Sequence, residues 1–512
     1  MTRRPVPPRF YDVVVLGAYL EPLLCAALLA REGLRVLVLG QGAPEPSYAL
    51  GDVEVEPYGL TIAGAQSPVV QTTLEELALK QDVRQRMLDR ATVFQLLLAE
   101  HRLNVHADAE RWLGELGREL PSVQRQATDI NRTLSEARAE LDALVARELS
   151  WPPESFLERQ QFSLAASAQR FDRHGQGWTS WNQLPIGHPL RTAFEALLPH
   201  VSGLLPGQHS DLTRARLHGH ALSGVTELSG SWTWFREALF ARIRSWGSDV
   251  RPRDRLSSIH REARRGHSLQ LAGTDEEIGC SKIVHGTPVG ELTQLLPERG
   301  ALGRIFERVG EPRARAYRSS VHVLLDSRGM PSALEPLALL CASSTNPNRA
   351  FLLRTREVDA DRTLLMASGL VEEHLIDTAS SPLHFLREDA LDALRTVIPF
   401  FDEHAIWVDS PHDGLPPRSL RDGTELRSSD PWNRGPHTMR AVYDYPTRRA
   451  LGVCALPTRT PVRGLFLCNE QVAPGLGFEG SFLTATSVAR MIASQDRRQE
   501  WLRRGPWARR RV

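Results

Sequence analysis

The pattern of apolar residues near the N-terminus predicts a strand, a tight turn, a helix and a second strand. Residues 13–16 form a short, continuous apolar run, which is typical of a parallel strand covered on both faces. Gly17 follows this run at the expected turn. A helix is predicted over 23–31 and ends at Gly33, and the apolar run 36–39 supplies the next strand. The segment therefore predicts a β-α-β unit that starts a parallel sheet.

The turn after the first strand departs from the glycine pattern of dinucleotide-binding units. Such units have glycines in a G-x-G-x-x-G spacing, because the pyrophosphate lies almost against the backbone at the positive end of the helix. The three positions here are Gly17, Tyr19 and Pro22, so only the first glycine is present. Glu21 adds a negative charge close to where the diphosphate would lie. The pattern predicts the fold of such a unit and leaves binding of the nucleotide open.

The end of the second predicted strand lacks the acidic residue that usually binds the adenosine ribose. Gly40 stands at this position, and Gln41 beside it is the candidate replacement. A hydrogen bond to a charged group is worth roughly 1.5–3 kcal/mol. Its loss would therefore weaken nucleotide binding by about one to two orders of magnitude.

Helical and extended segments follow in the first half of the chain. An amphipathic helix is expected over 72–88, and a strand pair with a charged turn over 94–105. Residues 107–149 read as almost entirely helical, with one interruption at Pro121. The aromatic and proline-rich region 151–215 is explained either as core or as the wall of a substrate cavity.

The second half predicts a return to the first sheet and then a separate sheet. A helix over 232–246 and a strand over 280–285 repeat the style of the opening unit. Strands over 319–325 and 350–353 predict a second, mostly antiparallel sheet, with a helix over 388–397 near it.

Composition and charge exclude several classes of protein. The chain has 512 residues, enough for two or three domains, and its net charge of +1 from 62 basic and 61 acidic residues offers no field for nucleic acid. Its five cysteines form no C-x-x-C pair, and no apolar signal segment precedes the first strand. A cytoplasmic location is therefore expected.

One polar stretch invites a metal interpretation. Residues 402–413 contain several acidic and histidine side chains, but Pro411 prevents a single helix from presenting both histidines. We therefore predict a solvated loop around Pro411 and Gly414 and no metal site.

The C-terminal region contains a second informative motif. An apolar strand over 465–468 ends at Asn469 and Glu470, and a glycine-rich turn over 474–480 leads into a long apolar helix that starts at Ser481. Such a turn directs backbone amides at the charged atoms of a ligand. The glycines also have an explanation without any ligand, because a strand-to-helix corner needs flexible backbone.

Together, the opening unit and the C-terminal turn resemble the phytoene desaturase-like branch of the FAD-dependent amine oxidoreductase superfamily, with a degenerate N-terminal dinucleotide motif. The resemblance implies an α/β fold, with a Rossmann-like FAD/NAD(P)-binding domain and a discontinuous α+β substrate domain. The expected discontinuous Rossmann-like FAD-binding-type domain comprises residues 10–75, 216–300 and 455–495. The helical and antiparallel-sheet substrate domain comprises 76–215 and 301–454, and a basic tail comprises 496–512.

The resemblance also implies a cofactor and its contacts. FAD is the expected cofactor, with Leu256 presenting its backbone to the adenine and Glu470 standing at the acidic position on the flavin side. No catalytic residue is implied, since hydride transfer to a flavin needs no acid or base from the protein. The expected cofactor-binding residues are Gly17, Gln41, Leu256, Glu470, Gly475, Gly477 and Gly480.

Two functions follow from these expectations. The first is an FAD-dependent oxidoreductase of the desaturase or dehydrogenase type, which oxidises an apolar, isoprenoid or carotenoid-like substrate by hydride transfer to flavin. The alternative is a flavin-free pseudoenzyme of the same fold that binds a lipid, another apolar small molecule or a protein. Tyr19 and Glu21 favour the alternative, and the intact C-terminal glycines favour the flavoprotein.

The last residues add a separate clue. Residues 496–512 are rich in arginine and contain two tryptophans, a composition that suits peripheral contact with an anionic membrane surface. A solvated terminus is the simpler explanation.

Overall fold

The computed structural model describes most of the chain, and every structural statement below concerns the described part. It consists of residues 9–87, 92–169, 179–228, 231–262, 266–296, 302–303, 305, 307, 310–341, 349–378, 383–426 and 434–495. The predicted basic tail, 496–512, lies outside these residues.

The first sheet is built around the opening strand. β1 pairs in parallel with β2 and with β12, and further parallel strands, β9 and β20, extend the sheet on either side. An antiparallel meander, β10 to β12, adds the remaining strands. The strands are β1 (Arg9–Leu16), β2 (Val36–Leu39), β9 (Asp249–Arg251), β10 (Leu256–Glu262), β11 (Gly266–Leu271), β12 (Glu277–His285) and β20 (Leu465–Leu467).

Alternate residues of β1 enter different cores, which explains its continuous apolar sequence. Val13 and Val15 pack with helices on one face of the sheet, whereas Val14 and Leu16 pack into a second apolar cluster on the other face. A strand buried on both faces has no polar position. The prediction for residues 13–16 and 36–39 is therefore confirmed.

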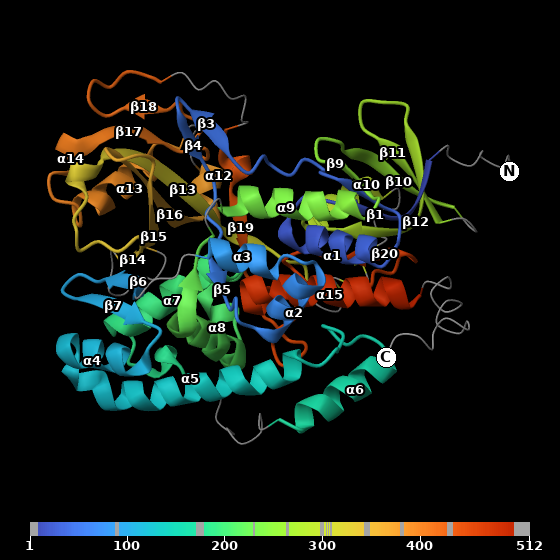
Figure 1. The fold of residues 1–512 in the computed structure, drawn as a ribbon, viewed down its shortest axis with the longest axis horizontal. Coiled ribbons are helices and arrows are strands. Elements are labelled where there is room, and N and C mark those ends of the chain that lie inside the picture. Colours follow the sequence, from blue (N-terminus) through green and yellow to red (C-terminus); the bar gives the residue numbers. More distant parts are fainter. Residues whose placement is uncertain are drawn as a thin grey trace.

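The second sheet has nine strands and is mostly antiparallel, as predicted. Figure 1 shows it beside the first sheet, at the left of the view. Its strands are β6 (Thr92–Leu97), β7 (Arg102–His106), β13 (Ala314–Asp326), β14 (Leu337–Cys341), β15 (Ala350–Glu357), β16 (Arg362–Glu372), β17 (Ala405–Asp409), β18 (Arg418–Ser419) and β19 (Arg440–Tyr443). Two short pairs stand apart, β3 (Tyr48–Leu50) with β4 (Val53–Val55), and β5 (Ile62–Ala63) with β8 (Val225–Thr226).

Helices fill the space around the two sheets. Next to the first sheet, α1 packs against both α15 and α9. Away from this sheet, the long α5 packs against α8. The helices are α1 (Leu20–Arg31), α2 (Pro68–Glu76), α3 (Lys80–Arg86), α4 (Ala109–Glu119), α5 (Gln124–Val145), α6 (Phe156–Ser167), α7 (Pro189–Val201), α8 (Asp211–Gly224), α9 (Ser231–Ser245), α10 (Val289–Leu295), α12 (Glu373–Thr378), α13 (Phe385–Arg395), α14 (Phe401–His404) and α15 (Gly477–Ser494). Among these described helices, none is both long and apolar enough to cross a membrane.

One predicted helix is divided in the structure. The segment 72–88 was expected to be continuous, but α2 ends before Ala78 and α3 begins after it. Ala78 has φ of 53°, a left-handed conformation that ends a helix. An alanine gives no sign of this in the sequence, because it is also the best helix former.

The prediction of a solvated loop around Pro411 is wrong. Asp409, His412 and Asp413 are fully buried. Arg387 binds Asp413 at 2.5 Å and Arg434 binds Asp409 at 2.6 Å, so the two carboxylates are paired with arginines from other segments. The described residues contain no group of three or more side chains placed to hold a metal ion.

The C-terminal helix is tied to the centre of the molecule by a buried carboxylate. Glu479, in the first turn of α15, accepts hydrogen bonds from Arg216 at 2.7 and 3.1 Å, from His220 and from Ser67. Arg216 also pairs with Asp142 of α5 at 2.5 Å. Burial raises the pKa of Glu479, but the charge of Arg216 and the bond from His220 outweigh it and hold this pKa below its usual range.

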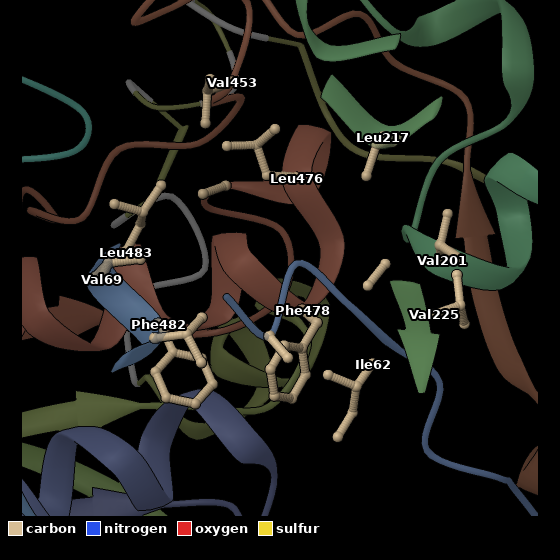
Figure 2. Close-up of a cluster of buried hydrophobic side chains, with 14 of the residues drawn as sticks. Ile62, Val69, Val201, Leu217, Val225, Val453, Leu476, Phe478, Phe482 and Leu483 are labelled. Carbon is tan, nitrogen blue, oxygen red and sulfur yellow. The ribbon is translucent and has the colours of Figure 1, made fainter. Parts of the chain in front are cut away.

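Apolar side chains surround this ionic cluster. Figure 2 shows Phe478 and Phe482 of α15 near Ile62 of β5 and Val69 of α2, with Leu476 above them in the view. The polar contacts of Glu479 are therefore enclosed by a well-packed core, where an unpaired charge would have no access to water.

We expect the Glu479→Gln substitution to lower the free energy of unfolding by about 3–5 kcal/mol, because it leaves the buried charge of Arg216 short of its partner. Urea unfolding followed by circular dichroism measures this change. The matched control is Glu75→Gln on α2, where an exposed carboxylate lies 3.2 Å from Lys80. The control should change stability by less than about 1 kcal/mol, and equal effects of the two substitutions would contradict the role assigned to Glu479.

Candidate functional site

A cavity of about 350 Å³ lies where the carboxyl ends of β1, β12 and β20 meet strands of the second sheet. Its walls include the turn after β1, the start of α15, and side chains from β13 and β19. Ligands of open α/β sheets bind outside the carboxyl ends of the strands, so its position is that of a binding site. We therefore follow the candidate residues from the first turn to this cavity.

The turn after β1 has the backbone of a nucleotide-binding turn. Gly17 has φ of 104°, and its amide donates to the carbonyl of Leu39 at 2.8 Å. A Cβ at Gly17 would lie 3.2 Å from Gly286 and Thr287, so the neighbouring strand end leaves little room for a side chain. Tyr19 lines the cavity, and burial followed by the charge of Glu291 raises its pKa to about 12.

Glu21 places a carboxylate between the first turns of two helices. It lies in the first turn of α1 and accepts a hydrogen bond at 2.6 Å from Ser481 in α15. Burial, and then the charge of Glu470, raise the pKa of Glu21 to about 7. A helix N-terminus attracts anions, and here an acidic side chain of the protein already lies at this position.

Gln41 lies at the end of the predicted nucleotide site where the adenosine would bind. Its side-chain oxygen accepts from the Leu256 amide at 2.8 Å, and its side-chain nitrogen donates to the Leu256 carbonyl at 3.4 Å. The resemblance assigns the backbone of Leu256 to the adenine. The backbone amide and carbonyl of Leu256 are therefore both bonded to the carboxamide of Gln41. This carboxamide presents a donor beside an acceptor, as an adenine edge does.

Neighbouring contacts also exclude the usual acidic side chain from this end. A Cβ at Gly40 would collide with the carbonyl of Pro252, so a longer acidic side chain has no room there. The ribose therefore lacks its usual carboxylate, and the backbone of Leu256 is already bonded to Gln41. In this arrangement these residues do not fit the adenosine half of FAD.

The glycines of the C-terminal turn are explained by packing. A Cβ at Gly477 would collide with the carbonyl of Val201, and one at Gly480 with the carbonyl of Ala473. At Gly475 it would lie 2.9 Å from the carbonyl of Val453. The turn needs glycine at all three positions to bring these backbones together, with or without a ligand.

The structure brings only part of the predicted site to the cavity. Glu470 and Gly477 line it, whereas Gly17, Gln41, Leu256, Gly475 and Gly480 do not. Asn469 also lines the cavity, and its side-chain nitrogen donates to the carbonyl of Thr287 at 2.7 Å. The cofactor-binding roles of the seven residues stay predictions.

Three lining residues were missed from the sequence. Arg318 of β13, Arg440 of β19 and Tyr58 all line the cavity. Arg318 stands immediately before the strand predicted over 319–325, and the sequence gives no signal of its position at the cavity. Nothing local in the sequence connects it with Arg440 or Tyr58, because only strand pairing and chain packing bring them together.

Solved structures of oxidoreductases have the same overall fold. An oxidoreductase from Methanosarcina mazei has 14% sequence identity and a TM-score of 0.58, with 93% of this chain and 99% of that chain covered. Putrescine oxidase bound to putrescine has 15% identity and a TM-score of 0.59, with 95% and 99% covered. Cyclohexylamine oxidase from Brevibacterium oxydans IH-35A has 15% identity and a TM-score of 0.54, again with 95% and 99% covered.

These likenesses show the fold. Comparison with family models and with the sequences of curated proteins gives no match. The chain has the fold of FAD-dependent amine oxidases and related oxidoreductases, so the predicted Rossmann-like α/β class is confirmed. The phytoene desaturase-like branch, the domain boundaries and the bound cofactor stay predictions.

We expect Gly40→Ala to destabilise the protein by about 1–3 kcal/mol, because the added methyl group overpacks the contact with Pro252. The matched control is Gly114→Ala, in the exposed interior of α4, where a Cβ meets no atom within 4 Å. The control should instead stabilise by about 0.5–1 kcal/mol. Chemical denaturation measures both, and a neutral or stabilising Gly40→Ala would contradict the close contact with Pro252.

Proposed function

We propose that this chain is a flavin-free member of an oxidoreductase fold, and that it binds a small organic molecule in the cavity between its two sheets. The observation that carries the proposal is the pairing of Gln41 with both backbone groups of Leu256. An incoming adenine would have to break both of these hydrogen bonds.

The remaining half of the site supports binding of a molecule smaller than FAD. The cavity of about 350 Å³ is at the lower end of the sizes found for ligand pockets, which are about 300–1,000 Å³. Part of its wall is apolar, which suits the apolar ligand or lipid expected from the sequence. The apolar lining side chains are Leu20, Leu60, Val201, Trp232, Met439 and Phe478.

The second candidate is the FAD-dependent oxidoreductase that transfers hydride from an apolar, isoprenoid-like substrate. The position of Glu470 at the cavity favours it, since the resemblance places an acidic residue there on the flavin side. For this function Gln41 would have to release the backbone of Leu256, and Glu21 would have to leave the diphosphate position. The protein would then supply orientation and exclude water around the flavin.

The absorption spectrum of the protein, purified and then incubated with excess FAD and desalted, distinguishes the two candidates. We expect none of the near-ultraviolet and blue absorption bands of an oxidised flavin. A flavin-retaining oxidase carried through the same desalting step controls for loss of cofactor. Stoichiometric flavin bands in this protein would overturn the flavin-free proposal and favour the oxidoreductase.

A further inference from the structure

Two arginines stand opposite each other on the wall of the cavity. Arg318 of β13 is the register partner of Arg440 of β19, and both line the cavity. Residues directly opposite in an antiparallel pair have Cβ atoms about 4.5–5.5 Å apart, and like charges at such positions destabilise a sheet. A negatively charged group at this wall would therefore stabilise the pair.

Arg318 lacks full compensation for its burial. Its Nε atom is buried and has no hydrogen-bond partner among the described residues. Burial lowers the pKa of Arg318, and the charge of Arg440 lowers it further, whereas Glu470 acts in the opposite direction. Arg354, which is also buried, has instead an ion pair with Glu227 at 2.8 Å.

A third donor lies beside the two arginines. The hydroxyl group of Tyr58 is buried and has no hydrogen-bond partner within the described part of the chain. The guanidinium of Arg440 lies 4.6 Å from the centre of the Tyr58 ring, so these side chains are held next to each other. A buried donor without an acceptor costs about 1–3 kcal/mol, which a ligand oxygen would recover.

The wall formed by β13 and β19 favours a carboxylate ligand. Glu470 is an acidic lining side chain whose charge acts on both Arg318 and Tyr58. Glu21 and Glu291 also line the cavity, and burial followed by the charge of Glu470 raises the pKa of Glu21 to about 7. No described carboxylate accepts a hydrogen bond from the Nε atom of Arg318 or from the hydroxyl of Tyr58. A ligand carboxylate suits this position, because it accepts paired hydrogen bonds from guanidinium groups.

We propose that the cavity binds a small organic acid, with its carboxylate at Arg318, Arg440 and Tyr58 and its apolar body against Trp232 and Met439. This assignment rests on the proposed function and names the class of its ligand. The acid lies at the second sheet, beside the wall of the cavity formed by β13 and β19.

Titration calorimetry on the full-length protein tests the assignment. The probes are benzoate, 3-phenylpropionate, indole-3-acetate and octanoate, each with its primary amide, and inorganic phosphate. We expect at least one acid to bind about tenfold or more tightly than its amide, since a hydrogen bond to a charged group is worth about that factor. Arg318→Met should remove this preference, and Arg440→Met should reduce it.

The matched control is Arg315→Met on the same strand, where the side chain is half exposed and lies 3.3 Å from Glu373. This variant should keep the preference for the acid. Equal binding of acids and amides, a preference that survives Arg318→Met, binding of no acid, or tighter binding of phosphate would each overturn the carboxylate assignment. The comparison of acid with amide uses the unaltered protein, so it decides the matter even where a variant fails to fold.

Failure of the proposed function has a different signature. Retention of FAD by the purified protein would overturn the flavin-free proposal and the acid assignment together. Equal binding of acid and amide without FAD would overturn the assignment alone.

Discussion

The buried carboxylate of Glu479 is the interaction on which the arrangement of the molecule depends. It receives hydrogen bonds from Arg216 and His220 of α8 and from Ser67 before α2, and Arg216 extends the cluster to Asp142 of α5. Residues from the beginning, middle and end of the chain thereby meet at the first turn of α15. Moving one of these segments away would leave a buried charge without its partner, which is energetically costly. The segments therefore keep their positions relative to one another.

The position of α15 determines what the cavity can bind. Its first turn brings Ser481 to the carboxylate of Glu21, and its glycines allow close contact with Val201 and Ala473. Putrescine oxidase and cyclohexylamine oxidase have the same fold as this chain. In this chain Gln41 closes the adenosine end with the hydrogen-bonding groups of an amide, whereas the end at the second sheet keeps donors without acceptors. The adenosine end therefore argues against a bound nucleotide, whereas the end at the second sheet favours a bound ligand that accepts hydrogen bonds.

Local patterns predicted much of the fold. The apolar run at 13–16 is a strand because both of its faces are buried, and that constraint is visible in the sequence itself. The strand predicted over 280–285 also forms, although Ser281 within it is exposed. The break at Ala78 was not visible, since a single left-handed residue leaves the helical periodicity unchanged. The loop around Pro411 was mistaken for solvated because its arginine partners come from distant segments.

The candidate site was predicted in part for the same reason. Gln41 and Leu256 were both named from the sequence, each as a ligand of FAD, but their contact with each other depends on how β2 and β10 approach in space. Arg318 and Arg440 were missed because only the pairing of β13 with β19 makes them neighbours. Sequence patterns thus predicted which elements surround the site, whereas side-chain contacts across elements needed the structure.

The closure of the adenosine end is tested most directly by a crystal structure of the protein grown with a large excess of FAD. The account predicts that the carboxamide of Gln41 still bonds to the amide and carbonyl of Leu256 and that no dinucleotide lies between Gly17 and Gly40. An adenine bonded to Leu256, with Gln41 displaced, would contradict the account.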